Sequence, residues 1–280
     1  METWMYGTAV VTGTTHGIGT VTARELARAG FSVVMLVRDP VAGELAATQI
    51  RRQVPSAAVD VVPCDLASFA SVRSAAADVR RMHPPLALLV NNAGIVSTWH
   101  RRSHDGYELT FATNHLGPFL LTERLRDHLA PRARIINLAS RAHYRGVPDF
   151  ESAADPKARY SATAAYSRSK LANVMHTFAL ARRLAGSEVC VNCLHPGVVA
   201  SNLLPRWLRL VKPLLSKVVL DVERGAQTTL HLALSNAVTG MSGRYFDEDQ
   251  QVRRALACAY DQDLQERLWS LSEQWTGSRA

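Results

Sequence analysis

Short apolar runs, many of them β-branched, alternate with amphipathic stretches along most of the chain. The runs at 8–13 and 31–37 predict strands, and the stretch between them, at 17–30, has apolar residues at helical spacing. The alternation continues with predicted strands at 57–63, 86–94, 133–140, 188–197 and 243–246. Helices are predicted near 40–53, 67–82 and 106–129, and another helix carries residues 166–170. The pattern therefore predicts strands that are separated by helices.

The predicted strands are apolar at most positions, which is typical of strands covered by helices on both faces. Such strands, alternating with helices, predict an α/β fold with a doubly wound (Rossmann) parallel sheet. We find no linker and no repeat of solenoid period, so we expect 1–280 to form a single domain. The leucine-rich segment 198–236 interrupts the alternation. It predicts either a small helical lid over the substrate or a plain packing helix.

Composition narrows the class of protein. Hydrophobic residues make up 47% of the 280 positions, enough for a sizeable core. No apolar run approaches the roughly 20 residues of a membrane span, and the first residues lack the pattern of a secretory signal. We therefore expect a cytoplasmic protein without a membrane span. The net charge is +8, but basic residues are spread over most predicted helices, which favours a solvated surface over a nucleic-acid site.

Two of the four cysteines, Cys190 and Cys193, form a CxxC pair inside a predicted strand. Residues three apart on a strand point to opposite faces, so the two thiols are poorly placed to share a metal ion. No second cysteine or histidine pair completes a metal site. We expect buried structural cysteines and no metal.

The segment TGTTHGIG at 12–19 follows the first predicted strand and opens the first predicted helix. In that context Gly13 permits a tight turn, Gly17 lets the backbone approach a phosphate, and Gly19 lets the helix pack closely on the sheet. The helix N-terminus adds free N–H groups and a partial positive charge. The segment predicts a binding site for the pyrophosphate of a dinucleotide.

The end of the second predicted strand bears on which dinucleotide binds. An acidic residue there would bind the adenosine ribose and repel a 2′-phosphate. Here Val37 is followed by Arg38, whose guanidinium can pair with a phosphate. We therefore expect NADP(H) rather than NAD(H), although Asp39 could pair with Arg38 or contact the ribose itself.

The TGxxxGxG spacing, NNAG at 91–94 and Tyr166 four positions before Lys170 together resemble the short-chain dehydrogenase/reductase family. The resemblance covers nearly the whole chain. The segments at 114–122, 165–173, 195–199 and 242–246 are most similar to the retinol dehydrogenase and WW-domain oxidoreductase branch. We expect no counterpart of the membrane anchor that is common in animal members of that branch.

The resemblance implies four catalytic residues. Ser140 would bind and polarise the substrate oxygen, and Tyr166 would exchange a proton with it. Lys170 would lower the pKa of the Tyr166 phenol and bind the nicotinamide ribose, and Asn114 would hold a water that links Lys170 to solvent. Taken singly, Ser140 could be a strand-end cap, Asn114 a helix-interior amide and Lys170 a solvated charge.

The resemblance also implies a set of cofactor contacts. His16 lies where some NADP-dependent relatives carry a basic residue, and Asp65 resembles the aspartate that binds the adenine amino group, although it could instead cap a helix. The implied contacts are Gly13, Thr15, His16, Gly17, Ile18, Gly19, Arg38, Asp65, Leu66, Asn91, Asn92, Ala93, Gly94, Tyr166, Lys170, Pro196, Gly197, Val199 and Ser201.

The predicted function is an NADP(H)-dependent oxidoreductase that interconverts a small lipophilic alcohol and its ketone or aldehyde. Two alternatives stay open: a non-redox biosynthetic enzyme on the same fold, such as an epimerase or cyclase, and an NADP(H)-binding interaction protein without turnover. The resemblance also implies a homodimer or homotetramer, since many relatives pair through their two long central helices. The substrate and the physiological direction cannot be predicted from these residues.

Overall fold

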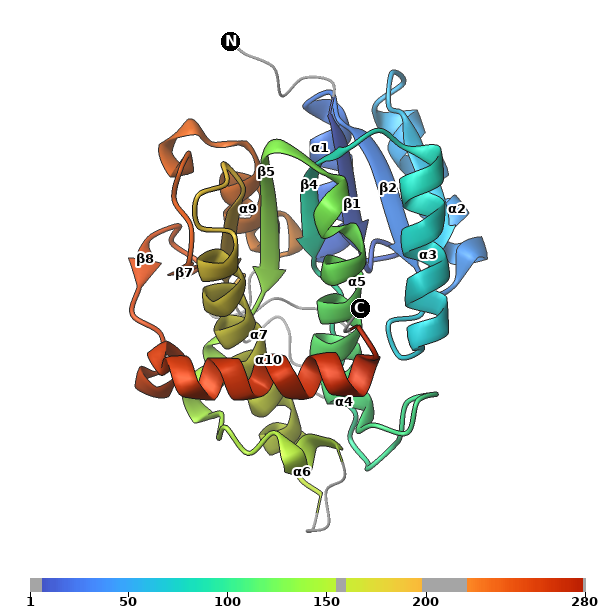
Figure 1. Cartoon of the computed structure of the whole chain (residues 1–280). Helices are drawn as coiled ribbons and strands as arrows, with labels where there is room; N and C mark the ends of the chain where they lie inside the picture. The colour runs from blue at the N-terminus through green and yellow to red at the C-terminus, as the bar shows by residue number, and fades with distance from the viewer. Residues whose placement is uncertain (1–6, 155–159, 198–220, 279–280) are drawn as a thin grey trace.

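The computed structural model describes residues 7–154, 160–197 and 221–278 (Figure 1). Its described strands form one sheet in the order β3-β2-β1-β4-β5-β6-β7-β8. Their bounds are β1 Thr8–Thr12, β2 Ser32–Val37, β3 Val59–Pro63, β4 Leu86–Asn91, β5 Leu129–Leu138, β6 Cys190–Leu194, β7 Arg244–Phe246 and β8 Val252–Arg253. The strands from β1 to β7 run parallel, and β8 pairs with β7 antiparallel. The predicted doubly wound parallel sheet is confirmed.

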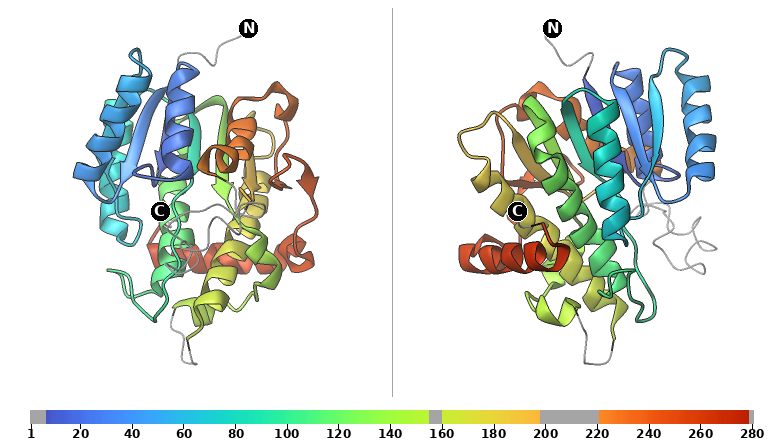
Figure 2. Two further views of the ribbon diagram at one scale, coloured as in Figure 1. Left: turned by 180° about the vertical axis from the view of Figure 1, so that it is seen from behind. Right: turned by 45° about the vertical axis from the view of Figure 1, so that its right-hand side comes forward.

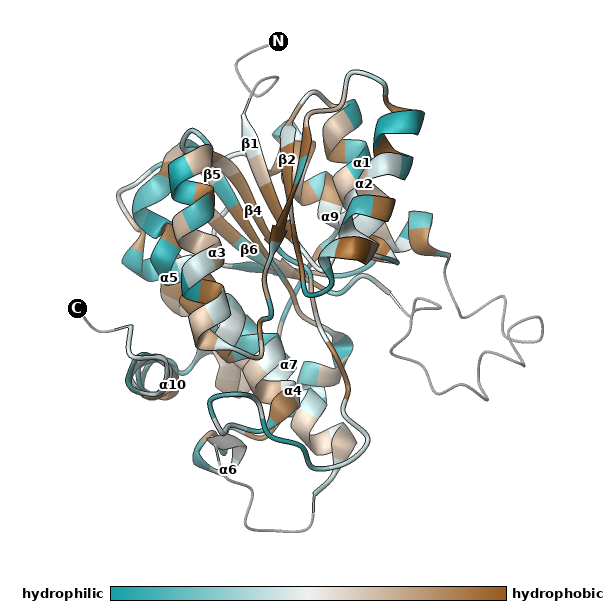
Figure 3. Ribbon diagram, turned by 90° about the vertical axis from the view of Figure 1, so that its right-hand side faces the viewer, coloured by the Kyte–Doolittle hydropathy of each residue, from teal (hydrophilic) through white to brown (hydrophobic). Residues whose placement is uncertain are grey.

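Helices cover both faces of the sheet (Figures 2 and 3). One face carries α1 (Ile18–Arg28), α2 (Pro40–Gln53) and α9 (Val222–Leu234). The opposite face carries α3 (Phe69–Met82), α5 (Gly117–Leu125) and α7 (Ala162–Arg183). Each layer packs its apolar side chains into its own cluster against the sheet. Every residue of β1 is buried as a result, which agrees with the apolar run at 9–11 in its centre.

The single long helix predicted near 106–129 is divided into several elements. Glu108 caps α4 (Leu109–Phe111), a π-helical turn η1 (Ala112–Leu116) leads into α5, and a 3-10 turn η2 (Arg126–His128) precedes β5. At the join, a Cβ on Gly117 would lie 2.3 Å from the Leu66 carbonyl oxygen. Glycine therefore lets the helix pass close to the turn after β3. This interruption has no signal in the hydrophobic period.

The second half of the chain contains elements that the hydrophobic pattern did not predict. Besides β8 these are the short helices η3 (Arg141–Arg145), α6 (Glu151–Ala154), η5 (Asn236–Val238) and η6 (Ala257–Tyr260), and the helix α10 (Gln262–Thr276). In Figure 1, α10 lies across the outer side of α7 and α5. The guanidinium of Arg183 stacks 3.8 Å from the ring of Trp269 in this contact. Any pairing of two chains through α5 and α7 would have to accommodate α10.

The expected lid lies mostly outside the described residues, which resume at Asp221. The described part, α9, packs against α1 and covers the sheet, so it serves as the packing helix that was the alternative interpretation. No helix in the described part of the chain is both long and apolar enough to cross a membrane.

The cysteines lie where the sequence placed them. Cys190 and Cys193 are both buried in β6 and carry free thiols. Burial raises the pKa of the Cys193 thiol to about 12, so it stays protonated near neutral pH. The predicted burial of this pair is confirmed.

Candidate active site

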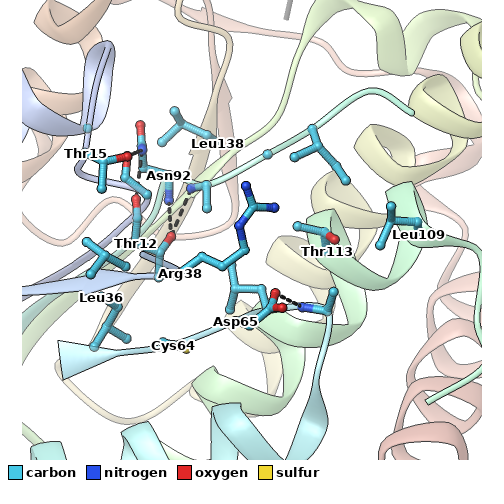
Figure 4. A pocket seen from close by; sticks show the side chains of 18 of the residues that line it. Thr12, Thr15, Leu36, Arg38, Cys64, Asp65, Asn92, Leu109, Thr113 and Leu138 are labelled. Atoms are coloured by element: carbon cyan, nitrogen blue, oxygen red, sulfur yellow. Dashed lines mark hydrogen bonds between the residues drawn. The ribbon is translucent and has the colours of Figure 1, made fainter. Parts of the chain in front are cut away.

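A pocket of about 750 Å³ opens at the carboxyl ends of the parallel strands (Figure 4). This edge is where ligands bind in open α/β sheets. Most of the predicted cofactor residues line the pocket: Gly13, Thr15, His16, Gly17, Ile18, Gly19, Arg38, Asp65, Leu66, Asn92, Ala93, Gly94, Tyr166, Lys170 and Pro196. Val199 and Ser201, also predicted to bind the cofactor, lie outside the described residues.

The glycine turn between β1 and α1 is tightly packed at two of its three glycines. A Cβ on Gly19 would lie 2.2 Å from the Gly13 carbonyl oxygen, and one on Gly13 would lie 2.9 Å from the Ala93 Cα. Gly13 and Gly17 both have positive φ, near +70°. A Cβ on Gly17 would meet nothing within 4 Å, because this residue faces the pocket. The turn therefore leaves room for a ligand at the position predicted to contact a phosphate.

The N-terminus of α1 is not capped by a side chain. Side chains cap α2, α3, α7, α9 and α10, and α5 continues directly from the helical turn η1, whereas α1 begins at Gly17, which offers no side-chain cap. The first N–H groups of α1 therefore face the pocket without a side-chain acceptor. An anion at this point would satisfy them and would interact favourably with the helix dipole. The residues present fit the pyrophosphate of a dinucleotide.

The end of β2 places a free cation in the same pocket. The exposed Arg38 side chain points into it (Figure 4). The Asp39 carboxylate instead caps α2 by accepting hydrogen bonds from the backbone N–H groups of Val41 and Ala42, at 3.0 and 3.2 Å. Asp39 is therefore engaged with the backbone, and no ion pair joins it to Arg38 in the described part of the chain.

Asp65 lies on the turn that follows β3. Its carboxylate accepts a hydrogen bond from the Ala67 N–H at 2.9 Å and lies 3.6 Å from His104 Nε2. The helix α3 is capped by Ser68, whose hydroxyl accepts from the Ser71 N–H. The alternative interpretation of Asp65 as the helix cap is therefore wrong, because that role falls to Ser68. Asp65 stabilises the turn and lines the pocket.

Of the two asparagines at the end of β4, only Asn92 lines the pocket. The Asn91 side chain is buried below the pocket, where its amide donates to Thr122 and Asn137, so the expected cofactor contact of this residue is wrong for its side chain. Asn92 lines the pocket, and its amide donates to the backbone oxygens of Thr12 and Gly13 at 2.8 and 3.2 Å. Asn92 therefore ties β4 to the glycine turn.

Ser140 and Tyr166 meet beside the pocket. Ser140 follows β5, caps η3 and accepts a hydrogen bond from the Ala142 N–H at 3.2 Å. Its side chain also hydrogen-bonds the Tyr166 phenol. Burial raises the pKa of Tyr166, and the hydrogen bond with Ser140 partly opposes that increase. Ser140 is thus a cap, as the plain interpretation held, and also a partner of Tyr166.

Lys170 is buried one helical turn beyond Tyr166. Its Nζ donates to the Leu138 carbonyl oxygen at 2.8 Å and lies 5.7 Å from the centre of the Tyr166 ring. Burial lowers the pKa of Lys170 from 10.5 to about 8. The interpretation of Lys170 as a solvated charge is therefore wrong, since only 4% of the residue is exposed.

Asn114 lies in the π-helical turn η1 and is fully engaged. Its amide donates to the Ile95 carbonyl and the Ser169 hydroxyl, both at 3.0 Å, and its side-chain oxygen accepts from the Ile95 N–H at 2.8 Å. Ser169 in turn donates to the Tyr166 carbonyl oxygen at 2.8 Å. Asn114 therefore joins the segment after β4 to the turn of α7 that carries Tyr166. The water-holding role implied by the resemblance stays a prediction.

Several pocket residues were not identified from the sequence. The segment after Gly94 contributes Ile95, Val96, Arg101, Arg102, Ser103 and His104, and Leu109 and Thr113 follow from the next helical elements. The only available signal was the cluster of basic residues in WHRRSHD at 99–105. Composition alone could not place that cluster beside a pocket, because it lies on an irregular loop.

Comparison with known proteins agrees with this geometry. The family model described as short chain dehydrogenase matches residues 7–209. The chain belongs to the short-chain dehydrogenase family. It is 40% identical to retinol dehydrogenase 14 of Homo sapiens, over 98% of this chain and 87% of that protein. It is also 36% identical to short-chain dehydrogenase TIC 32 B, chloroplastic, of Brassica napus, over 95% of this chain and 87% of that protein.

Solved structures share the fold. A structure of an uncharacterized protein from Mycobacterium Paratuberculosis superposes with a TM-score of 0.80 and 34% identity, covering 97% of this chain and 93% of that one. The blue fluorescent protein from a metagenomic library, solved in complex with NADPH, gives a TM-score of 0.70 at 26% identity, covering 86% and 95%. The oxidoreductase family and the Rossmann-like fold predicted from the sequence are confirmed.

Proposed function

We propose that this protein is an NADP(H)-dependent oxidoreductase that interconverts a lipophilic alcohol and its ketone or aldehyde. The observation that carries the proposal is the meeting of Ser140, Tyr166 and Lys170 beside a pocket that begins at an uncapped helix N-terminus. Arg38 supports the phosphorylated cofactor, because its cation faces the pocket while the neighbouring Asp39 caps α2. The retinol dehydrogenases among the relatives suggest retinoids as substrates to test first.

When bound, a nicotinamide cofactor would supply the hydride chemistry of the proposed reaction, to the carbonyl carbon in reduction and from the alcohol in oxidation. Ser140 orients the substrate oxygen, and Tyr166 gives that oxygen a proton during reduction. The raised pKa of Tyr166 keeps the phenol protonated near neutral pH, which suits a proton donor. Lys170 contributes a buried positive charge near the phenol and would bind the nicotinamide ribose. These roles support carbonyl reduction as the direction to assay first.

The test is turnover with NADPH or NADH, followed through the absorbance of the reduced nicotinamide. The substrates are all-trans-retinal, a long-chain aliphatic aldehyde and a steroid ketone. We expect faster turnover with NADPH, and a loss of roughly 10²- to 10⁴-fold in kcat for Tyr166→Phe, because the general acid is removed. The NADPH dissociation constant of this variant should stay within about twofold of the wild type. Tyr107→Phe is the matched control. It also removes a tyrosine hydroxyl, but that hydroxyl bonds the Trp275 carbonyl and not a proposed catalytic residue.

The outcomes separate the possible functions. Turnover that depends on Tyr166 supports the proposal. Undiminished turnover of Tyr166→Phe would overturn the mechanism. NADPH binding without reduction of any carbonyl in the set would favour a non-redox enzyme or a binding protein on this fold.

A further inference from the structure

The pocket has a second basic wall that the predicted cofactor contacts do not include. Arg101, Arg102 and His104, from the loop between β4 and α4, line the same pocket as Arg38. Arg38 follows β2, so the two sources of positive charge come from segments more than sixty positions apart in the sequence. The fold alone brings them to one pocket.

Hydrogen bonds hold this loop against the turn that carries Asp65. The His104 N–H donates to the Ala67 carbonyl at 3.0 Å, and the Asp105 carboxylate accepts from the Phe69 N–H at 2.8 Å. On the other side, the Arg101 carbonyl accepts from the Leu109 N–H at 2.8 Å. The backbone of the loop is therefore fixed at one end to the segment after Asp65, which the family resemblance assigns to the adenine, and at the other end to the start of α4.

The positive charge of this wall exceeds the available negative charge. Asp39 caps α2, and Asp65 accepts from Ala67 and lies near His104; these are the only carboxylates among the described residues that line the pocket. Arg102 donates to the Gly106 carbonyl at 2.7 Å and so helps to hold the loop. Arg101 is exposed, and its guanidinium has no hydrogen bond or ion pair within the described chain.

We propose that Arg101 is a second cationic contact, beside Arg38, for the phosphate on the 2′-oxygen of the cofactor's adenosine. This inference rests on the proposed NADP(H) function. The pyrophosphate already has the uncapped N–H groups of α1, whereas the loop of Arg101 is anchored to the Asp65 turn at the adenosine end. Two guanidinium groups can share the charge of one phosphate dianion, and each can donate two parallel hydrogen bonds to it.

The test uses two probes that lack the nicotinamide, so catalysis does not enter. Adenosine 2′,5′-bisphosphate and 5′-AMP differ only in the 2′-phosphate, and their dissociation constants are measured by titration calorimetry at fixed ionic strength. We expect Arg101→Ala to weaken binding of the bisphosphate about tenfold and binding of 5′-AMP less than twofold. Arg101→Lys should weaken binding of the bisphosphate less than Arg101→Ala does. Arg52→Ala is the matched control, because Arg52 is an exposed cation in the last turn of α2, away from the pocket. It should change neither constant by more than about twofold.

The outcomes test the role of Arg101 separately from the proposed use of NADP(H). A selective loss for the bisphosphate in Arg101→Ala supports the inference. An equal loss for both probes would overturn it, because Arg101 would then contact a part that both molecules share. No loss for either probe, in a wild type that prefers the bisphosphate, would overturn the role of Arg101 and leave the proposed cofactor intact. A wild type without that preference would refute the NADP(H) assignment together with this inference.

Discussion

Replacing Lys170 with methionine should raise the free energy of unfolding at pH 7 while it abolishes turnover. The ammonium group is buried and has no carboxylate within ion-pair distance in the described residues. A buried unpaired charge disfavours the folded state, because the unfolded chain can hydrate it. Methionine has a similar unbranched length and no charge. The proposed site therefore retains Lys170 at the expense of stability.

The size of the effect follows from the lowered pKa of Lys170, about 8 in the folded protein against 10.5 in the free side chain. At pH 7 this lowering corresponds to roughly 3 kcal/mol lost from the free energy of unfolding. The variant also loses the hydrogen bond to the Leu138 carbonyl, but Asn173 still donates to that oxygen at 3.3 Å. Allowing about 1 kcal/mol for the lost hydrogen bond, we expect Lys170→Met to raise the free energy of unfolding at pH 7 by about 1–3 kcal/mol.

The buried charge of Lys170 also predicts how the stability advantage of Lys170→Met changes with pH. The penalty in the wild type is complete below the folded-state pKa of about 8, and it disappears as the pH rises toward the unfolded value of 10.5. The advantage of Lys170→Met should therefore shrink between these two pH values, because the lysine becomes neutral in both states.

Urea unfolding at pH 7, 8.5 and 10 measures this advantage, with nucleotide omitted because a bound ligand would add its own stability. The exposed Arg52→Met in α2 controls for the loss of a positive charge. Arg52→Met should change the free energy of unfolding by no more than about 0.5 kcal/mol at each pH. A Lys170→Met variant that is less stable than the wild type at pH 7 would refute the reasoning, and so would an advantage that does not change with pH.

Two further predictions concern arginines. Arg38→Asp should weaken NADPH about 100-fold, because an attractive charge becomes repulsive, and NADH less than about threefold; comparable losses for both nucleotides in fluorescence titrations would remove Arg38 from cofactor selection. The buried Arg134 guanidinium donates to the carbonyls of Leu232, Ala233 and Ser235 at the end of α9 and to the Thr239 hydroxyl. Arg134→Met should lower the free energy of unfolding by about 2–4 kcal/mol through the loss of these bonds, and an unchanged urea midpoint would contradict that role.

Local sequence patterns predicted the repeating part of the fold well. The strand at 8–13 and the helix at 17–30 are observed as β1 and α1 with ends shifted by only a few residues, because period and burial coincide in them. The helix predicted near 106–129 shows the limit of this approach. The helix breaks beside Pro118, which has no N–H for a helical hydrogen bond, and where Asn114 bonds Ile95 and Gly117 approaches Leu66; these two contacts are not local in sequence.

The candidate site divides in the same way. The glycine turn and the Tyr166 and Lys170 pair were visible because their spacing is fixed by a single loop and a single helix. The position of the basic loop that carries Arg101 was not visible, since the loop bonds residues distant in sequence, Ala67 and Phe69.

The sequence by itself determined the alternation of strands and helices, the glycine turn between β1 and α1 and the types of residue in the candidate site. These properties depend on spacing within one element, which the chain fixes directly. The tertiary structure decided that Lys170 is buried without a carboxylate partner, that Asp39 is engaged as a helix cap, and that Arg101 enters the pocket of Arg38. Such facts depend on what surrounds a side chain in space, because burial and neighbouring charge set its pKa and its freedom to bind.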